Sequence, residues 1–162
     1  MTVSRGQVLG VILALVAAGL VLALWPQEKP GVKEAITRQV IHMTAAAERK
    51  DIAELMDGVA ESFQSGEGWD KPQLKGVLLG QVLRGEWVRV FVKDLDVTEV
   101  DSRHGTARLK IIFGRSQAEK LEALARESVM SAYLIDASFE LQDDTWRAVK
   151  ATHRTLSATE LF

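Results

Sequence analysis

The chain has 162 residues, which is about the length of one domain. Its formal net charge is −2. Residues 1–30 carry a net charge of +1, so residues 31–162 carry −3. Nucleic-acid binding needs clustered positive charge, so this mild negative charge argues against nucleic acid as the main partner. The chain contains no cysteine, which excludes disulfides, thiolate metal sites and a cysteine nucleophile.

An uninterrupted apolar run near the N-terminus predicts a membrane anchor over residues 8–25. The run, VLGVILALVAAGLVLALW, has 16 apolar residues among its 18 and no charged side chain. As a helix it covers about 27 Å, enough for the hydrocarbon core of a bilayer. Arg5 precedes it, so the positive-inside rule predicts a cytoplasmic segment 1–7 and an exported C-terminal domain, periplasmic if the source is bacterial. Trp25 falls where the helix reaches the far interface.

A cleaved signal peptide is the alternative interpretation of the same run. The apolar core of a signal peptide is usually about 7–15 residues long, and a small-x-small cleavage site follows it. The best candidate site here, residues 21–23, still lies inside the apolar run. A buried soluble helix is disfavoured because the run has no polar face. Both leading interpretations export the remainder of the chain.

Helical periodicity dominates the first half of the remaining sequence. After a polar linker over residues 26–31, apolar spacing predicts helices over 32–50, 52–59 and 70–84, with a short extended piece over 61–64. The caps proposed for the second and third helices are Asp51 and Asp70, and Pro72 and Gly85 mark the two ends of the third. The first helix carries an apolar stripe of Val32, Ile36, Val40, Met43 and Ala47, which leaves His42 exposed.

The second half changes to the two-residue period of strands. Strands are predicted over 87–100, 106–113, 131–141 and 146–156, with a helical insertion over 117–128 and a tail, 157–162, that carries no clear signal. Within 106–113 the predicted shared face consists of Ala107, Leu109, Ile111 and Phe113. Helices followed by antiparallel strands indicate an α+β domain over 32–156, in which the helices cover one face of a curved sheet.

Three local segments carry a resemblance to a known family. They are Ala46-Ala47-Glu48-Arg49-Lys50-Asp51-Ile52-Ala53-Glu54-Leu55-Met56, Glu61-Ser62-Phe63 leading into Gly68-Trp69-Asp70, and Asp143-Asp144-Thr145-Trp146-Arg147-Ala148-Val149. In this order the chain resembles the nuclear-transport-factor-2-like, or SnoaL-like, superfamily of cone folds. The resemblance implies a pocket between sheet and helices, often with dimerisation through the outer sheet face. Because members include enzymes, binders and interaction domains, it implies no reaction.

Alternation within residues 131–141 predicts which side chains face the helices. The apolar set is Tyr133, Ile135, Ala137, Phe139 and Leu141. Asp136 and Glu140 then point to the outer face, so they are poor candidates for a buried catalytic carboxylate. In the last strand Val149, Ala151 and His153 are predicted to share the inner face, with Arg147 and Thr155 at its ends. Neither strand alternation nor helical spacing places a carboxylate beside His153.

Four residues are candidates for the lining of a ligand cavity: Phe63, Trp69, Tyr133 and His153. Each has an ordinary structural alternative. Tyr133 fits a core position with its hydroxyl at the rim, His153 fits a structural histidine, and Trp69 fits a cover over the core edge. The three histidines of the chain are scattered without metal-ligand spacing, so we expect no metal and no cofactor.

These observations favour a membrane-anchored, exported, non-catalytic interaction or scaffold domain of the cell envelope. Its expected partners are the membrane, through residues 8–25, and either another protein or a second copy through the sheet. The alternative is a binder of a small hydrophobic ligand in the cone cavity, which an open cavity of ligand size would favour. A third hypothesis is an isomerase- or hydrolase-type enzyme that uses His153. A carboxylate within hydrogen-bond reach of that histidine would favour it.

Overall fold

The structure is a computed structural model that describes residues 30–85, 87, 89–116 and 130–161. Contacts divide the chain into two units, Met1–Pro30 and Gly31–Phe162, and the second holds almost all the described residues. The expected anchor over 8–25 and the expected helical insertion over 117–128 lie outside them. Among the residues that are described, no helix is both long and apolar enough to cross a membrane.

Along the second unit the helices come first and most of the strands follow them, as predicted. In chain order its elements are α2 (Val32–Glu48), α3 (Ile52–Asp57), β1 (Val59–Ser65), α4 (Lys71–Leu83), β2 (Arg89–Asp101), β3 (His104–Gly114), β4 (Met130–Gln142), β5 (Thr145–Thr155) and the 3-10 turn η1 (Ala158–Glu160).

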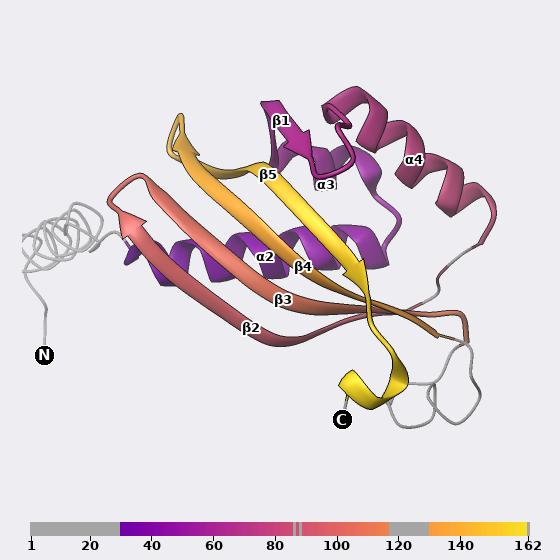
Figure 1. The fold of residues 1–162 in the computed structure, drawn as a ribbon. Coiled ribbons are helices and arrows are strands. Elements are labelled where there is room, and N and C mark those ends of the chain that lie inside the picture. The colour runs from indigo at the N-terminus through magenta and orange to yellow at the C-terminus, as the bar shows by residue number, and fades with distance from the viewer. Residues whose placement is uncertain (1–29, 86, 88, 117–129, 162) are drawn as a thin grey trace, which may run out of the picture. The chain divides into compact units, whose positions relative to one another are not determined.

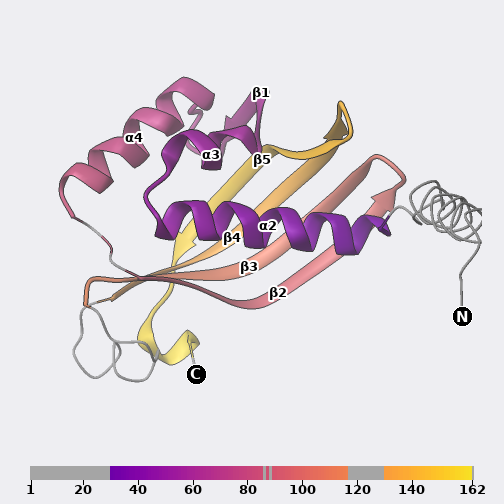
Figure 2. The ribbon, with the colours of Figure 1, turned by 180° about the vertical axis from the view of Figure 1, so that it is seen from behind.

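The five strands form one sheet in the order β1-β5-β4-β3-β2. The strands from β2 to β5 pair antiparallel, whereas β1 runs parallel to β5. Helix α2 lies across one face of the long, twisted sheet, and α4 lies near the end that holds β1 (Figures 1 and 2). The predicted α+β arrangement, with helices on one face of a curved sheet, is therefore confirmed. Sequence reasoning placed 61–64 as a short extended piece, and only the structure shows that it belongs to a strand pairing parallel with the last one.

Helix α2 packs its predicted apolar stripe into the core. Ile36 is fully buried and Val40 is 5% exposed, while the side chain of His42 is 53% exposed, as expected. The helix ends slightly before the predicted position because Lys50 adopts a φ of 63°, a left-handed conformation that no helix continues. Asp51 then caps α3 by accepting the backbone N–H of Glu54 at 3.0 Å.

Helix α4 begins and ends as its sequence predicts. Asp70 accepts the N–H of Gln73, and the Gln73 side chain accepts the N–H of Asp70, which completes a capping box. Gly85 follows the helix with a φ of 68°. No residue of α4 is fully buried, so this helix lies over the domain without entering its core.

The inner face of the sheet follows the predicted alternation in β3 and β4. Ala107 and Leu109 of β3 are buried in the same cluster as Ala137 and Phe139 of β4. On the outer face Asp136 forms an ion pair with Arg108 at 2.6 Å. Asp136 therefore points away from the helices, as predicted.

In the first half of β5, the prediction of which side chains face the helices was wrong. Trp146 and Ala148 are the buried residues there, not Arg147 and Val149. Phe139 pairs with Ala148 but Ser138 pairs with Lys150, so one extra residue stands in β5 at this point. Such a bulge moves every later side chain to the opposite face. It explains why Ala151 and His153 still line the inner side.

The C-terminal tail covers part of the outer face. Leu161 is 1% exposed and forms a second apolar cluster with Ile112, Ala132 and Leu156. Ile112 alternates with Ile111, which faces the helices, so this cluster lies on the opposite side of the sheet. The ammonium of Lys93 donates to the carbonyl of Leu161 at 2.6 Å. The tail carried no signal in the sequence because its apolar residues are too few to show a period.

Candidate functional site

An apolar cavity lies between the helices and the inner face of the sheet. Its volume is about 310 Å³, at the lower end of the range of small-molecule sites. Strands β3, β4 and β5 supply one side, and α2 and α3 supply another. Helix α4 contributes Leu74, Val77 and Leu78. Because α4 buries none of its residues completely, the space beneath it stays open.

The four residues named from the sequence all lie at this cavity. Phe63 comes from β1 and is 2% exposed. Tyr133 comes from β4, His153 from β5, and Trp69 from the loop between β1 and α4. The structure thus brings together side chains that are far apart in the sequence, because the parallel pairing of β1 with β5 carries the loop after β1 to the same end of the sheet.

A tight loop over residues 65–69 forms one end of the cavity. The Ser65 hydroxyl accepts the backbone N–H of Trp69 at 3.0 Å and that of Glu67 at 3.2 Å. Gly66 donates its N–H to the carbonyl of Ala151 in β5 at 2.8 Å. Gly68 has a φ of 85°, a conformation that other residues rarely adopt. These bonds hold the loop against β5.

This loop places a carboxylate beside His153, a neighbour that neither strand alternation nor helical spacing predicted. The Nδ1 atom of His153 is 3.1 Å from Oε1 of Glu67. The pair is only partly accessible, since the His153 side chain is 40% exposed and that of Glu67 is 35% exposed. No local spacing in the sequence reveals such a contact, because it depends on the pairing of β1 with β5.

The Glu67 carboxyl group favours its ionised form. Its pKa is lowered from 4.5, mainly by a hydrogen bond with the Ser65 side chain, and the charge of His153 lowers the pKa further. Partial burial acts in the opposite direction but does not prevail. The end of the cavity therefore carries a negative charge whose position is fixed by the loop.

A row of aromatic rings crosses the inner face of the sheet. Ring centroids lie 5.2 Å apart for Trp87 and Phe113, 6.1 Å for Phe113 and Tyr133, and 5.6 Å for Tyr133 and His153. The indole N–H of Trp87 donates to the carbonyl of Ala47 at 2.9 Å. Sequence reasoning did not single out Trp87 or Phe113, although the inward alternation of 106–113 already included Phe113. Edge contacts of this kind restrict how the Tyr133 and His153 rings can turn.

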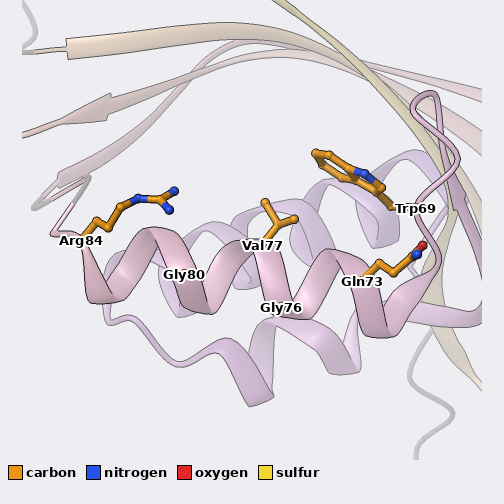
Figure 3. A pocket seen from close by; sticks show the side chains of 6 residues that line it. All are labelled: Trp69, Gln73, Gly76, Val77, Gly80 and Arg84. Atoms are coloured by element: carbon orange, nitrogen blue, oxygen red, sulfur yellow. The ribbon is translucent and has the colours of Figure 1, made fainter.

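A shallow groove runs along helix α4. Its volume is about 510 Å³, and Trp69, Gln73, Gly76, Val77, Gly80 and Arg84 line it. Figure 3 shows Trp69, Val77 and Arg84 projecting on the same side of α4. Trp69 and Val77 also line the cavity, so they form a wall shared by the two spaces. The position of Trp69 fits a residue that guards the cavity edge.

The other two histidines lie away from the cavity. His42 is 3.3 Å from Glu54, and Nδ1 of His104 is 2.9 Å from Asp101. Neither histidine lines the cavity. Within the part of the chain that the structure describes, no three His, Asp or Glu side chains gather into a group that could hold a metal ion.

The helices, the sheet and the cavity between them form an α+β fold that is similar to the cone fold of nuclear-transport-factor-2-like (NTF2-like) proteins. Among solved structures, an NTF2-like protein of unknown function from Pseudomonas putida KT2440 is similar, with a TM-score of 0.61 and 12% identity over 80% of this chain and 89% of that one. A ketosteroid isomerase-like protein from Erwinia carotovora atroseptica SCRI1043 matches with a TM-score of 0.58 and 12% identity, over 77% of this chain and 96% of that one.

A larger protein contains a similar fold. Bd1075 from Bdellovibrio bacteriovorus matches with a TM-score of 0.62 and 10% identity over 77% of this chain. This chain spans 41% of the length of that protein. No family model matches the sequence, and neither does any curated protein. At these identities the likeness is one of fold alone.

Proposed function

We propose that this chain is a membrane-anchored, exported domain of the cell envelope that binds a small apolar molecule in its cone cavity. The cavity of about 310 Å³ is the observation that carries the proposal. Its lining is mainly aliphatic and aromatic, with a few polar groups gathered where the 65–69 loop meets β5. A site with this composition suits an apolar ligand that has one polar end.

The anchor and the export of the domain rest on the sequence. Residues 8–25 are apolar without a charge, and Arg5 precedes them. We favour ligand binding over a scaffold function because an open, mainly apolar space of this size is typical of a small-molecule site. Protein interaction, with another chain or with a second copy through the outer sheet face, is the alternative if the cavity has no ligand.

Native mass spectrometry of the full chain, purified without denaturation and released from detergent, tests the proposal. We expect an adduct of constant small mass on the wild-type protein. Ala151→Leu adds three carbons at a cavity-lining position, so it should abolish the adduct. Ser138→Leu places the same side chain in a separate groove on the outer face of the sheet, which Thr106, Ser138 and Lys150 help to line, and not in the cavity, so it should keep the adduct. A bare wild-type protein would contradict the proposal and favour protein interaction.

A second candidate function is proton-transfer catalysis, favoured by the contact between Glu67 and His153. An imidazole oriented by a carboxylate is a common general base. The recovered compound tests this candidate: on incubation an enzyme should convert it to a product of different mass or to an isomer that chromatography separates, and His153→Phe should stop the conversion. A compound recovered unchanged would leave binding as the function.

A further inference from the structure

The polar end of the cavity holds one ring nitrogen, Nε2 of His153, to which no described residue is hydrogen-bonded. The Nδ1 atom of His153 lies against Glu67 at 3.1 Å. Since His153 lines the cavity and its side chain is 40% exposed, Nε2 is open to water or to a bound molecule.

The Glu67 carboxylate determines what Nε2 offers. The carboxylate charge lies 3.1 Å from Nδ1, where it attracts an N–H dipole and repels a nitrogen lone pair, so a neutral ring carries its proton on Nδ1. In a neutral imidazole one nitrogen donates and the other accepts. Nε2 is therefore an acceptor, and its best partner is a group that donates a proton.

The other walls of the cavity limit the rest of the ligand. Tyr133 stands edge-on to the His153 ring with centroids 5.6 Å apart, and Ile135 and Ala151 line the cavity with them. These neighbours suit a hydrocarbon body. The negative charge of Glu67 at the same end disfavours an anionic head group.

We infer that the cavity selects neutral apolar alcohols, whose hydroxyl group donates a hydrogen bond to Nε2 of His153. This inference rests on the proposed binding function and names the class of its ligand. Glu67 acts as a positioning residue that holds the imidazole in the accepting tautomer. Selection then comes from one directed hydrogen bond, which an ether of the same size cannot donate.

Two isomeric probes, 1-octanol and heptyl methyl ether, test the inference because they differ only in the hydroxyl proton donor. Binding is measured by equilibrium dialysis with the full chain in lipid nanodiscs at pH 8.5, above the usual titration range of histidine, with empty nanodiscs as the blank. We expect the alcohol to bind about fivefold more tightly than the ether. His153→Phe should reduce the preference to less than about twofold. His104→Phe, which removes a histidine paired with a carboxylate outside the cavity, should leave it unchanged.

Glu67→Gln provides a second variant of almost unchanged volume, in case His153→Phe does not fold. It should also reduce the preference, because the amide no longer fixes the tautomer. Equal binding of alcohol and ether by the wild-type protein would overturn the inference and leave apolar-ligand binding intact. Tighter binding of octanoate than of octanol would also overturn it, since an anion requires a donor at Nε2. No saturable binding of any probe would overturn the proposed function itself.

Discussion

Glu160 illustrates how one carboxylate can hold the C-terminal tail on the sheet. It accepts hydrogen bonds from the Ser157 backbone N–H at 2.9 Å, the Ser157 hydroxyl at 2.9 Å and the Arg154 guanidinium at 2.8 Å. These bonds lower the pKa of Glu160 from 4.5 to about 2, the Ser157 N–H contributing most. The bonds favour the charged form, so they act only while the carboxyl group is ionised.

Acid should therefore loosen this tail. Because the folded-state pKa is depressed, the stabilising contribution of Glu160 is complete above pH 4.5 and is lost as the pH falls towards about 2. Thermal unfolding of the wild-type protein and Glu160→Gln, followed from pH 6 to pH 2, measures the effect. The wild-type protein should melt at the higher temperature at pH 6, and the difference should vanish near pH 2. A difference that stays constant with pH would contradict this account.

At the scale of the elements, α4 is the helix with the least support from the core. It has no fully buried residue, and Leu79 and Leu83 are 43% and 87% exposed. Its order depends to a larger degree on its ends, where Asp70 and Gln73 form the capping box. Since α4 also lines the cavity, its local stability affects access to the site.

Asp70→Ala should therefore loosen α4 without unfolding the domain. Loss of an N-cap costs about 1 kcal/mol, so the amides of α4 should exchange about fivefold faster with solvent. Hydrogen exchange followed by mass spectrometry measures this. Asp51→Ala removes the cap of α3 and is the matched control, which should affect α3 and leave α4 unchanged. Equal acceleration of all elements by Asp70→Ala would show that α4 opens only with the whole domain.

At the scale of the whole molecule, the sheet separates two apolar clusters that different segments of the chain cover. The inner cluster is covered by helices and leaves a cavity. The outer cluster is covered by the tail of the chain itself, through Leu156 and Leu161. The rest of the outer face is polar, with a groove of about 450 Å³ that Thr98, Thr106, Ser138 and Lys150 help to line. A partner on this face would meet mainly hydroxyl and charged groups.

Topology is the whole-chain property that the sequence predicts most directly. A reporter that is active only after export should be active when fused to the C-terminus and inactive when fused to the N-terminus, because Arg5 precedes the apolar run. Removal of residues 8–25 is the control, and it should abolish the activity of the C-terminal fusion. A C-terminal reporter active only in the cytoplasm would contradict both the anchor and the signal-peptide interpretations.

Local signals in the sequence were sufficient for most of the fold. The caps Asp51 and Asp70, the stripe of α2 and the alternation of β3 and β4 depend on neighbours within a few residues, so their periods show in the sequence. Alternation in β4 predicted Tyr133, and alternation in the second half of β5 predicted His153, on the inner face, where the structure places them. The apolar run over 8–25 is likewise a local signal.

Three features were decided by the tertiary structure alone. The bulge between Ala148 and Lys150 reverses the face of the strand, and a bulge has no period that a sequence reveals. The contact between Glu67 and His153 requires β1 to pair with β5. The burial of Leu161 requires the outer face of the sheet to exist first. Each joins residues distant in the chain, whereas the sequence by itself determined only what neighbouring residues specify.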